Sequence, residues 1–152
     1  MLLTGCPGGG GDDGGPCGND GDVTATAQPN RLDTNPVADG SEIPVFPPPQ
    51  GGVFTELDVR IDGAATDDLE LVRIRIEDEA GQQLANVQYR AEGIPLMCDE
   101  DDTLVVFNLP VGFDASVMLP ALDGVAATLM LAVDTVDGTF EETWSVTLRV
   151  TS

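Results

Sequence analysis

The chain has 152 residues, of which 27 are acidic and only 6 are basic, so its formal net charge is -21. A surface this negative repels phosphate backbones and anionic lipid headgroups, which argues against nucleic-acid binding and against a polybasic membrane contact. The sequence contains no histidine, and this removes the commonest general base and the commonest transition-metal ligand. We therefore assign no catalytic residue and expect a protein that is not an enzyme.

The first third of the chain has the composition of a linker. Residues 1–50 hold 10 of the 18 glycines and 8 of the 11 prolines, with few large apolar side chains after Leu3. Such a segment cannot bury enough apolar surface to offset the entropy lost on ordering. We expect residues 7–50 to form a disordered tether, and a flexible coil of about 40 residues has a root-mean-square reach of about 35 Å.

Leu3, Thr4, Gly5 and Cys6 resemble the lipobox of bacterial lipoproteins. In that family the cysteine thiol receives a diacylglycerol and the residues before it are removed. The resemblance implies that residues 1–6 are the remnant of a lipoprotein signal peptide, and that its basic and apolar regions precede Met1. It also implies a lipid anchor at Cys6, membrane contact through that lipid alone, and a location in the bacterial cell envelope, at the outer membrane or cell surface.

Two cysteines remain once Cys6 carries a lipid, namely Cys17 and Cys98. An even number of cysteines in an oxidising compartment permits a disulfide. That bond would close a loop of about 80 residues and, in the chain-entropy model, contribute roughly 4 kcal/mol. Two unpaired thiols are the alternative, because parity does not establish the geometry.

The remaining hundred residues, 51–152, show the alternation of β-strands. Apolar and polar side chains alternate over residues 53–61 and again over 72–76, and a turn centred on Gly81 leads into a strand over 84–89. The apolar run at 104–109 predicts a central strand covered on both faces, and a short piece at 116–119 stops at Pro120. Strands over 125–133 and 144–150 follow, the second with Trp144 in the core.

Seven short strands separated by turns predict an all-β fold, a seven-stranded antiparallel Greek-key sandwich. Residues 128–150 resemble the closing hairpin of bacterial immunoglobulin-like domains, with Ala132, Asp134 and Gly138 at the matching positions. The run Pro-Pro-x-Gly-Gly-Val at 48–53, and Asp67 and Asp68 before Leu69, fit the opening strands of that family. This resemblance covers about residues 47–152 and implies an immunoglobulin-like β-sandwich.

A second resemblance competes with the first. The residues that carry it are Asp78, Gly81, Leu84, Ala85 and Val87, followed by Leu109, Pro110 and Gly112. They are similar to the signals of transthyretin-like, carboxypeptidase-regulatory-like repeats, which also form a seven-stranded Greek-key sandwich. Both families serve mainly as spacers, adhesion modules or binding modules, and a fold of this kind is only an analogy for function.

The acidic run Asp99, Glu100, Asp101 and Asp102 next to Cys98 is a candidate calcium site. Calcium takes six to eight oxygen ligands, and loops at the end of a sandwich can supply them. The run does not complete the D-x-[DN]-x-[DN]-G loop with its distal glutamate. We therefore expect a solvated acidic loop, with no metal and no other cofactor.

The sequence as a whole favours a non-catalytic cell-envelope lipoprotein that displays a β-sandwich for a structural, adhesion or binding role. We expect its partner to be a protein or a glycan. A calcium-dependent adhesion or assembly module is one alternative. A carboxylate-based glycan hydrolase is the other, since acidic pairs such as Glu141 and Glu142 are abundant.

Overall fold

The computed structural model describes residue 17 and residues 21–29, 35–47 and 52–151. Its strands in chain order are β1 (Thr24–Pro29), β2 (Ser41–Val45), β3 (Phe54–Asp62), β4 (Leu69–Asp78), β5 (Gln83–Arg90), β6 (Leu96–Cys98), β7 (Leu104–Gly112), β8 (Ala126–Thr135) and β9 (Gly138–Val150). Short helical segments lie in the loops: η2 (Thr66–Asp68), η3 (Ala91–Gly93) and α2 (Leu119–Leu122). None of the helices in these described residues is long and apolar enough to cross a membrane.

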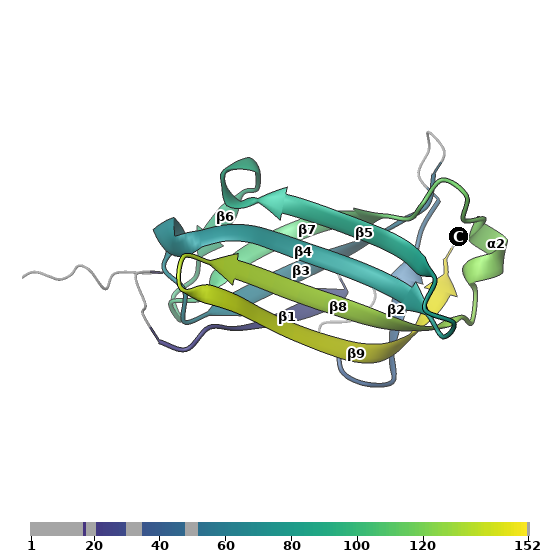
Figure 1. Ribbon diagram of the computed structural model, residues 1–152, viewed down its shortest axis with the longest axis horizontal. Helices are drawn as coiled ribbons and strands as arrows, with labels where there is room; N and C mark the ends of the chain where they lie inside the picture. The colour runs from purple at the N-terminus through teal and green to yellow at the C-terminus, as the bar shows by residue number, and fades with distance from the viewer. Residues whose placement is uncertain (1–16, 18–20, 30–34, 48–51, 152) are drawn as a thin grey trace, which may run out of the picture.

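The strands form two sheets that face each other (Figure 1). One sheet has the order β1-β3-β7-β6, and the other has the order β2-β9-β8-β4-β5. In order, β1, β3, β7 and β6 correspond to strands A, B, E and D of an immunoglobulin-type sandwich. The strands β9, β8, β4 and β5 correspond to G, F, C and C′, and β2 adds a fifth strand beside β9. The predicted all-β sandwich is confirmed.

The core lies between the sheets because successive side chains of a strand point to opposite faces. On β3, the inward residues Leu57, Val59 and Ile61 have no exposed surface, and Glu56 and Arg60 point outward. Val59 pairs with Val106 of β7 in antiparallel register. Each aliphatic side chain buried in this way contributes about 1.5–3 kcal/mol, so the alternation decides which face of each sheet becomes the interior.

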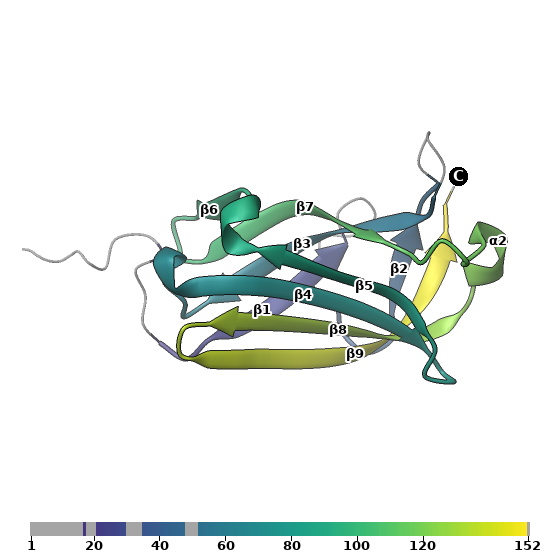
Figure 2. The same ribbon diagram turned by 45° about the horizontal axis from the view of Figure 1, so that its top comes forward.

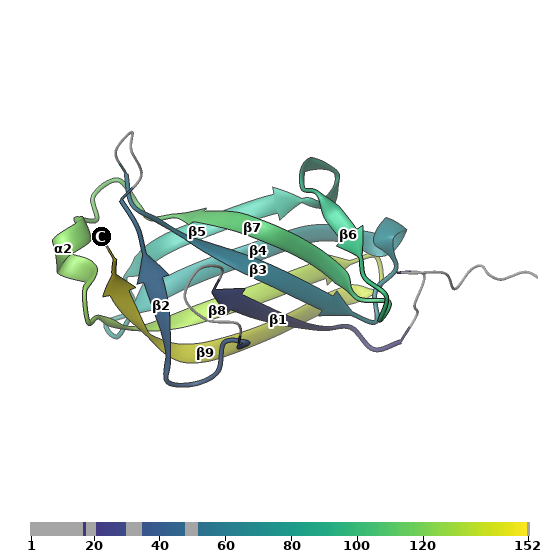
Figure 3. The same cartoon turned by 180° about the vertical axis from the view of Figure 1, so that it is seen from behind.

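The predicted tether over residues 7–50 is wrong for residues 24–29 and 41–45, which form β1 and β2. β1 pairs antiparallel with β3 in one sheet, and β2 pairs parallel with β9 in the other (Figure 3). The parallel pair is also an exception to the expected antiparallel sandwich. Ile43 and Val45 of β2 have no exposed surface, and Ala25 and Ala27 of β1 are buried. Burial of these side chains in the core therefore offsets the conformational entropy that β1 and β2 lose on ordering.

Nine strands replace the seven expected. The piece predicted at 116–119 is not a strand: residues up to Met118 lie in a loop, and Leu119 begins α2, which has a proline in its first turn. The three-residue strand β6, at Leu96–Cys98, was not anticipated. Trp144 is partly buried and packs against the core, opposite Leu129 of β8.

The side of the sandwich between β5 and β7 is closed by bonds that join the two sheets. The Tyr89 hydroxyl of β5 donates to the carbonyl oxygen of Pro110 of β7, and the Asp114 N–H donates to the carbonyl oxygen of Leu84 over 2.9 Å. Partial burial of Tyr89 raises the pKa of its phenol. Pro110 lies beyond the part of β7 that pairs with β6, and because it has no N–H it offers no donor to a further strand there.

Adjacent residues of β2 provide a test of its place in the domain. Ile43 is fully buried, whereas Glu42 is exposed and pairs with Arg149 of β9 over 2.9 Å. Ile43→Ala should lower the free energy of unfolding by about 2–5 kcal/mol, because it leaves a cavity in the core. Glu42→Ala should cost at most about 1 kcal/mol, the usual range for an exposed ion pair. Urea denaturation measures both, and equally small losses would show that β2 lies outside the cooperative fold.

Candidate functional site

The most distinctive chemical feature of the described residues is a disulfide between Cys17 and Cys98. It joins the chain ahead of β1 to the end of β6, across 81 positions in sequence, with the Cα atoms 5.5 Å apart. The structure thus joins the two cysteines whose pairing the sequence permits but leaves open. Cys17 is 3% exposed and belongs to the hydrophobic core, while Cys98 lies at the surface on an edge strand.

Backbone hydrogen bonds hold Cys17 in place in addition to the disulfide. Its N–H donates to the carboxylate of Asp102, and its carbonyl oxygen accepts the N–H of Thr66 over 2.8 Å. The Thr66 hydroxyl lies 3.4 Å from the sulfur of Cys98. Thr66 begins η2, between β3 and β4, and Asp102 lies between β6 and β7. The β3–β4 and β6–β7 loops therefore both bind the backbone of Cys17, the residue that also forms the disulfide.

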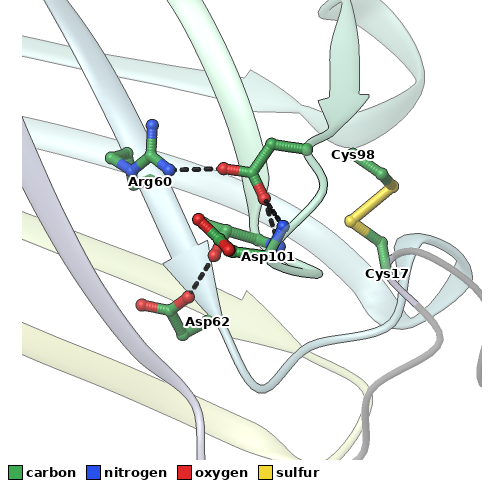
Figure 4. A network of polar contacts seen from close by, with 7 residues as sticks. Cys17, Arg60, Asp62, Cys98 and Asp101 are labelled. Atoms are coloured by element: carbon green, nitrogen blue, oxygen red, sulfur yellow. Dashed lines mark hydrogen bonds and ion pairs between the residues drawn. A yellow bond between two sulfur atoms is a disulfide. The ribbon is translucent and has the colours of Figure 1, made fainter.

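Figure 4 shows the polar contacts of the acidic loop beside the disulfide, and this loop is organised around Asp99. Its Oδ1 accepts the N–H groups of Asp101 over 2.9 Å and Thr103 over 3.0 Å, and its other oxygen pairs with Arg60 of β3. The Thr103 hydroxyl donates to Asp62 over 2.5 Å. The Thr103 N–H, with further help from the Asp101 N–H and Arg60, holds the pKa of Asp99 below its usual value. We call this group, together with the Cys17–Cys98 disulfide, the anchorage cluster.

Gly63 lets the N-terminal segment approach the anchorage cluster closely. Its φ is +82°, and a Cβ at this position would collide with the carbonyl oxygen of Asp22. Only glycine fits where the backbone before β1 passes over the turn after β3. The approach of these two segments is therefore built into the sequence at one position.

The calcium candidates Asp99, Glu100, Asp101 and Asp102 do not converge on a common point. The carboxylates of Asp99 and Asp102 already accept hydrogen bonds from the protein, and Asp101 is bound through its backbone N–H. Among the described residues, no group of three or more His, Cys, Asp or Glu side chains is arranged to hold a metal ion. The expected lipid attachment point, Cys6, lies outside the described residues.

Sequence reasoning missed the partners of this cluster, Arg60, Asp62 and Thr66. All three lie more than 30 positions from the cysteine or acidic-loop residue they contact, so no local pattern pointed to them. The sequence did contain a signal for the acidic loop. An aspartate such as Asp99 often caps a turn by accepting hydrogen bonds from the backbone N–H groups two and four residues later.

The five arginines in the described part of the chain all form ion pairs. They are Arg60, Arg73, Arg75, Arg90 and Arg149, each within 4 Å of a carboxylate. The basic side chains therefore offer little unbalanced positive charge to an anionic ligand, while most acidic side chains stay uncompensated.

No protein-family model matches this chain, and no curated protein is similar to it in sequence.

Removing either cysteine should destabilise the domain. In the chain-entropy model a loop of this length is worth about 4 kcal/mol, so Cys17→Ser and Cys98→Ser should each lower the free energy of unfolding by up to that amount. The double variant should lose no more than either single one, because both remove the same bond. Guanidinium denaturation with and without reductant measures the effect.

A thiol titration gives an independent check on the disulfide. The oxidised, denatured, unlipidated chain should show one reactive thiol, that of Cys6. Three reactive thiols would contradict the bond.

Asp99→Asn should destabilise the protein in a pH-dependent way. Because the folded-state pKa of Asp99 lies below its unfolded value of about 3.8, ionised Asp99 favours the folded state. The advantage of the wild type over Asp99→Asn should be complete above that pH and disappear as pH falls through the lowered folded-state pKa. Urea unfolding from pH 7 to pH 2 measures this difference, and a difference that is constant with pH would contradict the role of the charge.

Proposed function

We propose that this protein is a bacterial cell-envelope lipoprotein, attached to the membrane by a lipid on Cys6, which displays a non-catalytic β-sandwich for a structural, adhesion or binding role. The observation that carries the proposal is the disulfide between Cys17 and Cys98. Disulfides persist in exported proteins and are rare in the reducing cytosol. A disulfide that begins 11 residues after the lipobox-like Cys6 therefore supports export and lipid anchoring of the domain.

The chemistry of the described residues supports a role without catalysis. The polar side chains of the anchorage cluster are engaged in bonds that hold loops together, as the pairs Asp99–Arg60 and Thr103–Asp62 illustrate. The chain has no histidine, which leaves carboxylates as its main acid and base groups. A protein or a glycan remains the partner class, and the net charge of -21 disfavours nucleic acid.

The disulfide changes the length of the proposed tether. With Cys17 fixed to the domain, only residues 7–16 separate the lipid site from the sandwich, instead of the 44 residues expected from composition. A chain of this length spans at most about 40 Å even when fully extended. The domain would therefore sit close to the membrane, with the anchorage cluster as its membrane-proximal end.

Lipidation at Cys6 is the direct test of the proposal. Expressed in a bacterium with its natural upstream sequence, the protein should partition into detergent and gain the mass of a diacylglycerol and acyl chains at Cys6. Mass spectrometry of the N-terminal peptide and detergent-phase separation measure these two properties.

Cys6→Ser provides the matched control. It should abolish both the added mass and the partitioning, while Cys17→Ser should keep both, because only its disulfide is lost. Unchanged partitioning of Cys6→Ser would overturn the lipoprotein proposal.

A further inference from the structure

The end of the sandwich opposite the anchorage cluster carries an apolar pocket. It lies between the β4–β5 turn and the segment that joins β7 to β8, which includes α2. The apolar side chains that line it are Leu84, Val117, Met118, Ala121, Leu122 and Val125. β4 runs from η2 at the anchored end to Asp78 at the rim of this pocket, and its ten residues place the two ends about 30 Å apart. Figure 2 shows α2 and β6 toward opposite ends of the molecule.

Hydrogen bonds fix both walls of the pocket. Asp78 caps the β4–β5 turn, because its Oδ1 accepts hydrogen bonds from the N–H groups of Ala80 and Gln82, each 2.9 Å long. The other wall is tied down where the Gly124 N–H donates to Leu148 of β9 over 2.8 Å. The bond from Asp114 to Leu84 joins the two walls directly. Both walls of the pocket are therefore held by hydrogen bonds within the domain itself.

Met118 at this pocket is the most exposed large apolar side chain of the described residues, at 67%. A flexible thioether of this kind adapts its shape to different apolar partners. The pocket has a volume of about 270 Å³, which is below the range of roughly 300–1,000 Å³ typical of sites for drug-sized ligands. Its size suits one bulky apolar side chain of a protein partner.

The acidic residues around the pocket favour a partner with a basic surface. The two segments that build it, 78–84 and 114–125, contain Asp78, Glu79, Asp114 and Asp123 and no basic residue. Arg149 of β9 lies beside Gly124, where its guanidinium would be 3.6 Å from an added Cβ, but Arg149 is paired with Glu42. An approaching acidic surface would meet like charge, whereas a basic one would be attracted.

We propose that this pocket is a docking site for a cationic, amphipathic segment of another protein, which inserts a bulky apolar side chain between the β4–β5 turn and α2. Lysine or arginine side chains on either side of that apolar residue would meet the acidic rim. The pocket stands on the geometry alone; that it faces away from the membrane rests on the proposed function.

Methionine methyl NMR on the unlipidated 152-residue chain tests this proposal. The probe is an amphipathic helical peptide made of leucine and lysine, and the matched control is the same peptide with glutamate in place of lysine. The lysine peptide should shift the Met118 methyl signal saturably. The signal of Met97, which is 56% exposed near the anchored end, should not move, and the glutamate peptide should have no effect.

Ala121→Arg should weaken binding of the lysine peptide at least tenfold, because it fills the pocket with a like charge. Thr128→Arg, which makes a similar charge change on the exposed outer face of β8, should leave binding within about threefold of the wild type. Thermal unfolding checks that both variants fold, and Ser116→Arg replaces Ala121→Arg if that variant does not.

Three results would overturn the docking site: no saturable shift of Met118, equal shifts of Met97 and Met118, or equal binding by Ala121→Arg and Thr128→Arg. The last two would mean that net charge alone attracts the peptide. Because the measurement uses unlipidated protein in solution, its failure would leave the lipid-anchor proposal untouched.

Discussion

Burial of the inward side chains of two facing sheets determines how the described strands are arranged. β1 and β2 follow one another in sequence but extend opposite sheets. Val37, which precedes β2, donates its N–H to the carbonyl oxygen of Ala27 in β1 over 2.7 Å. Because Ile43 fills the core only when β2 pairs with β9, the strand nearest the C-terminus is held by residues from the first third of the chain.

Local signals in the sequence were sufficient for most strands after residue 53. β8 alternates over residues 127–133 and β9 over residues 144–150, and Asp137 and Gly138 mark the turn between them, so pattern and turn chemistry agree. β1 lacked such a signal because its inward residues Ala25 and Ala27 are small and contribute little to an apolar pattern. β2 contains Pro44, which is tolerated on an edge strand but weakens the strand pattern.

Non-local contacts explain what the sequence could not predict. β2 is stabilised by parallel pairing with residues more than 100 positions later in the chain. No turn motif or residue spacing in the sequence predicts such a distant partner. The same holds for the anchorage cluster: cysteine parity permitted the disulfide, but the bond from Cys17 to Asp102 requires two distant loops to meet. The stretch 116–119 was mistaken for a strand because its apolar residues line a pocket at the end of the sandwich and do not alternate across a sheet.

The position of the disulfide also decides how the domain would respond to mechanical tension. A force applied at Cys17 passes through the sulfur atoms into β6, so the residues between the two cysteines cannot be drawn out. Figure 1 shows the C-terminal end of β9 near α2, at the end of the molecule away from β6, to which Cys17 is bonded. A pull between Cys17 and Val150 therefore runs along the strands. The interstrand hydrogen bonds lie across that direction, so many of them must be sheared together before the sheets can separate.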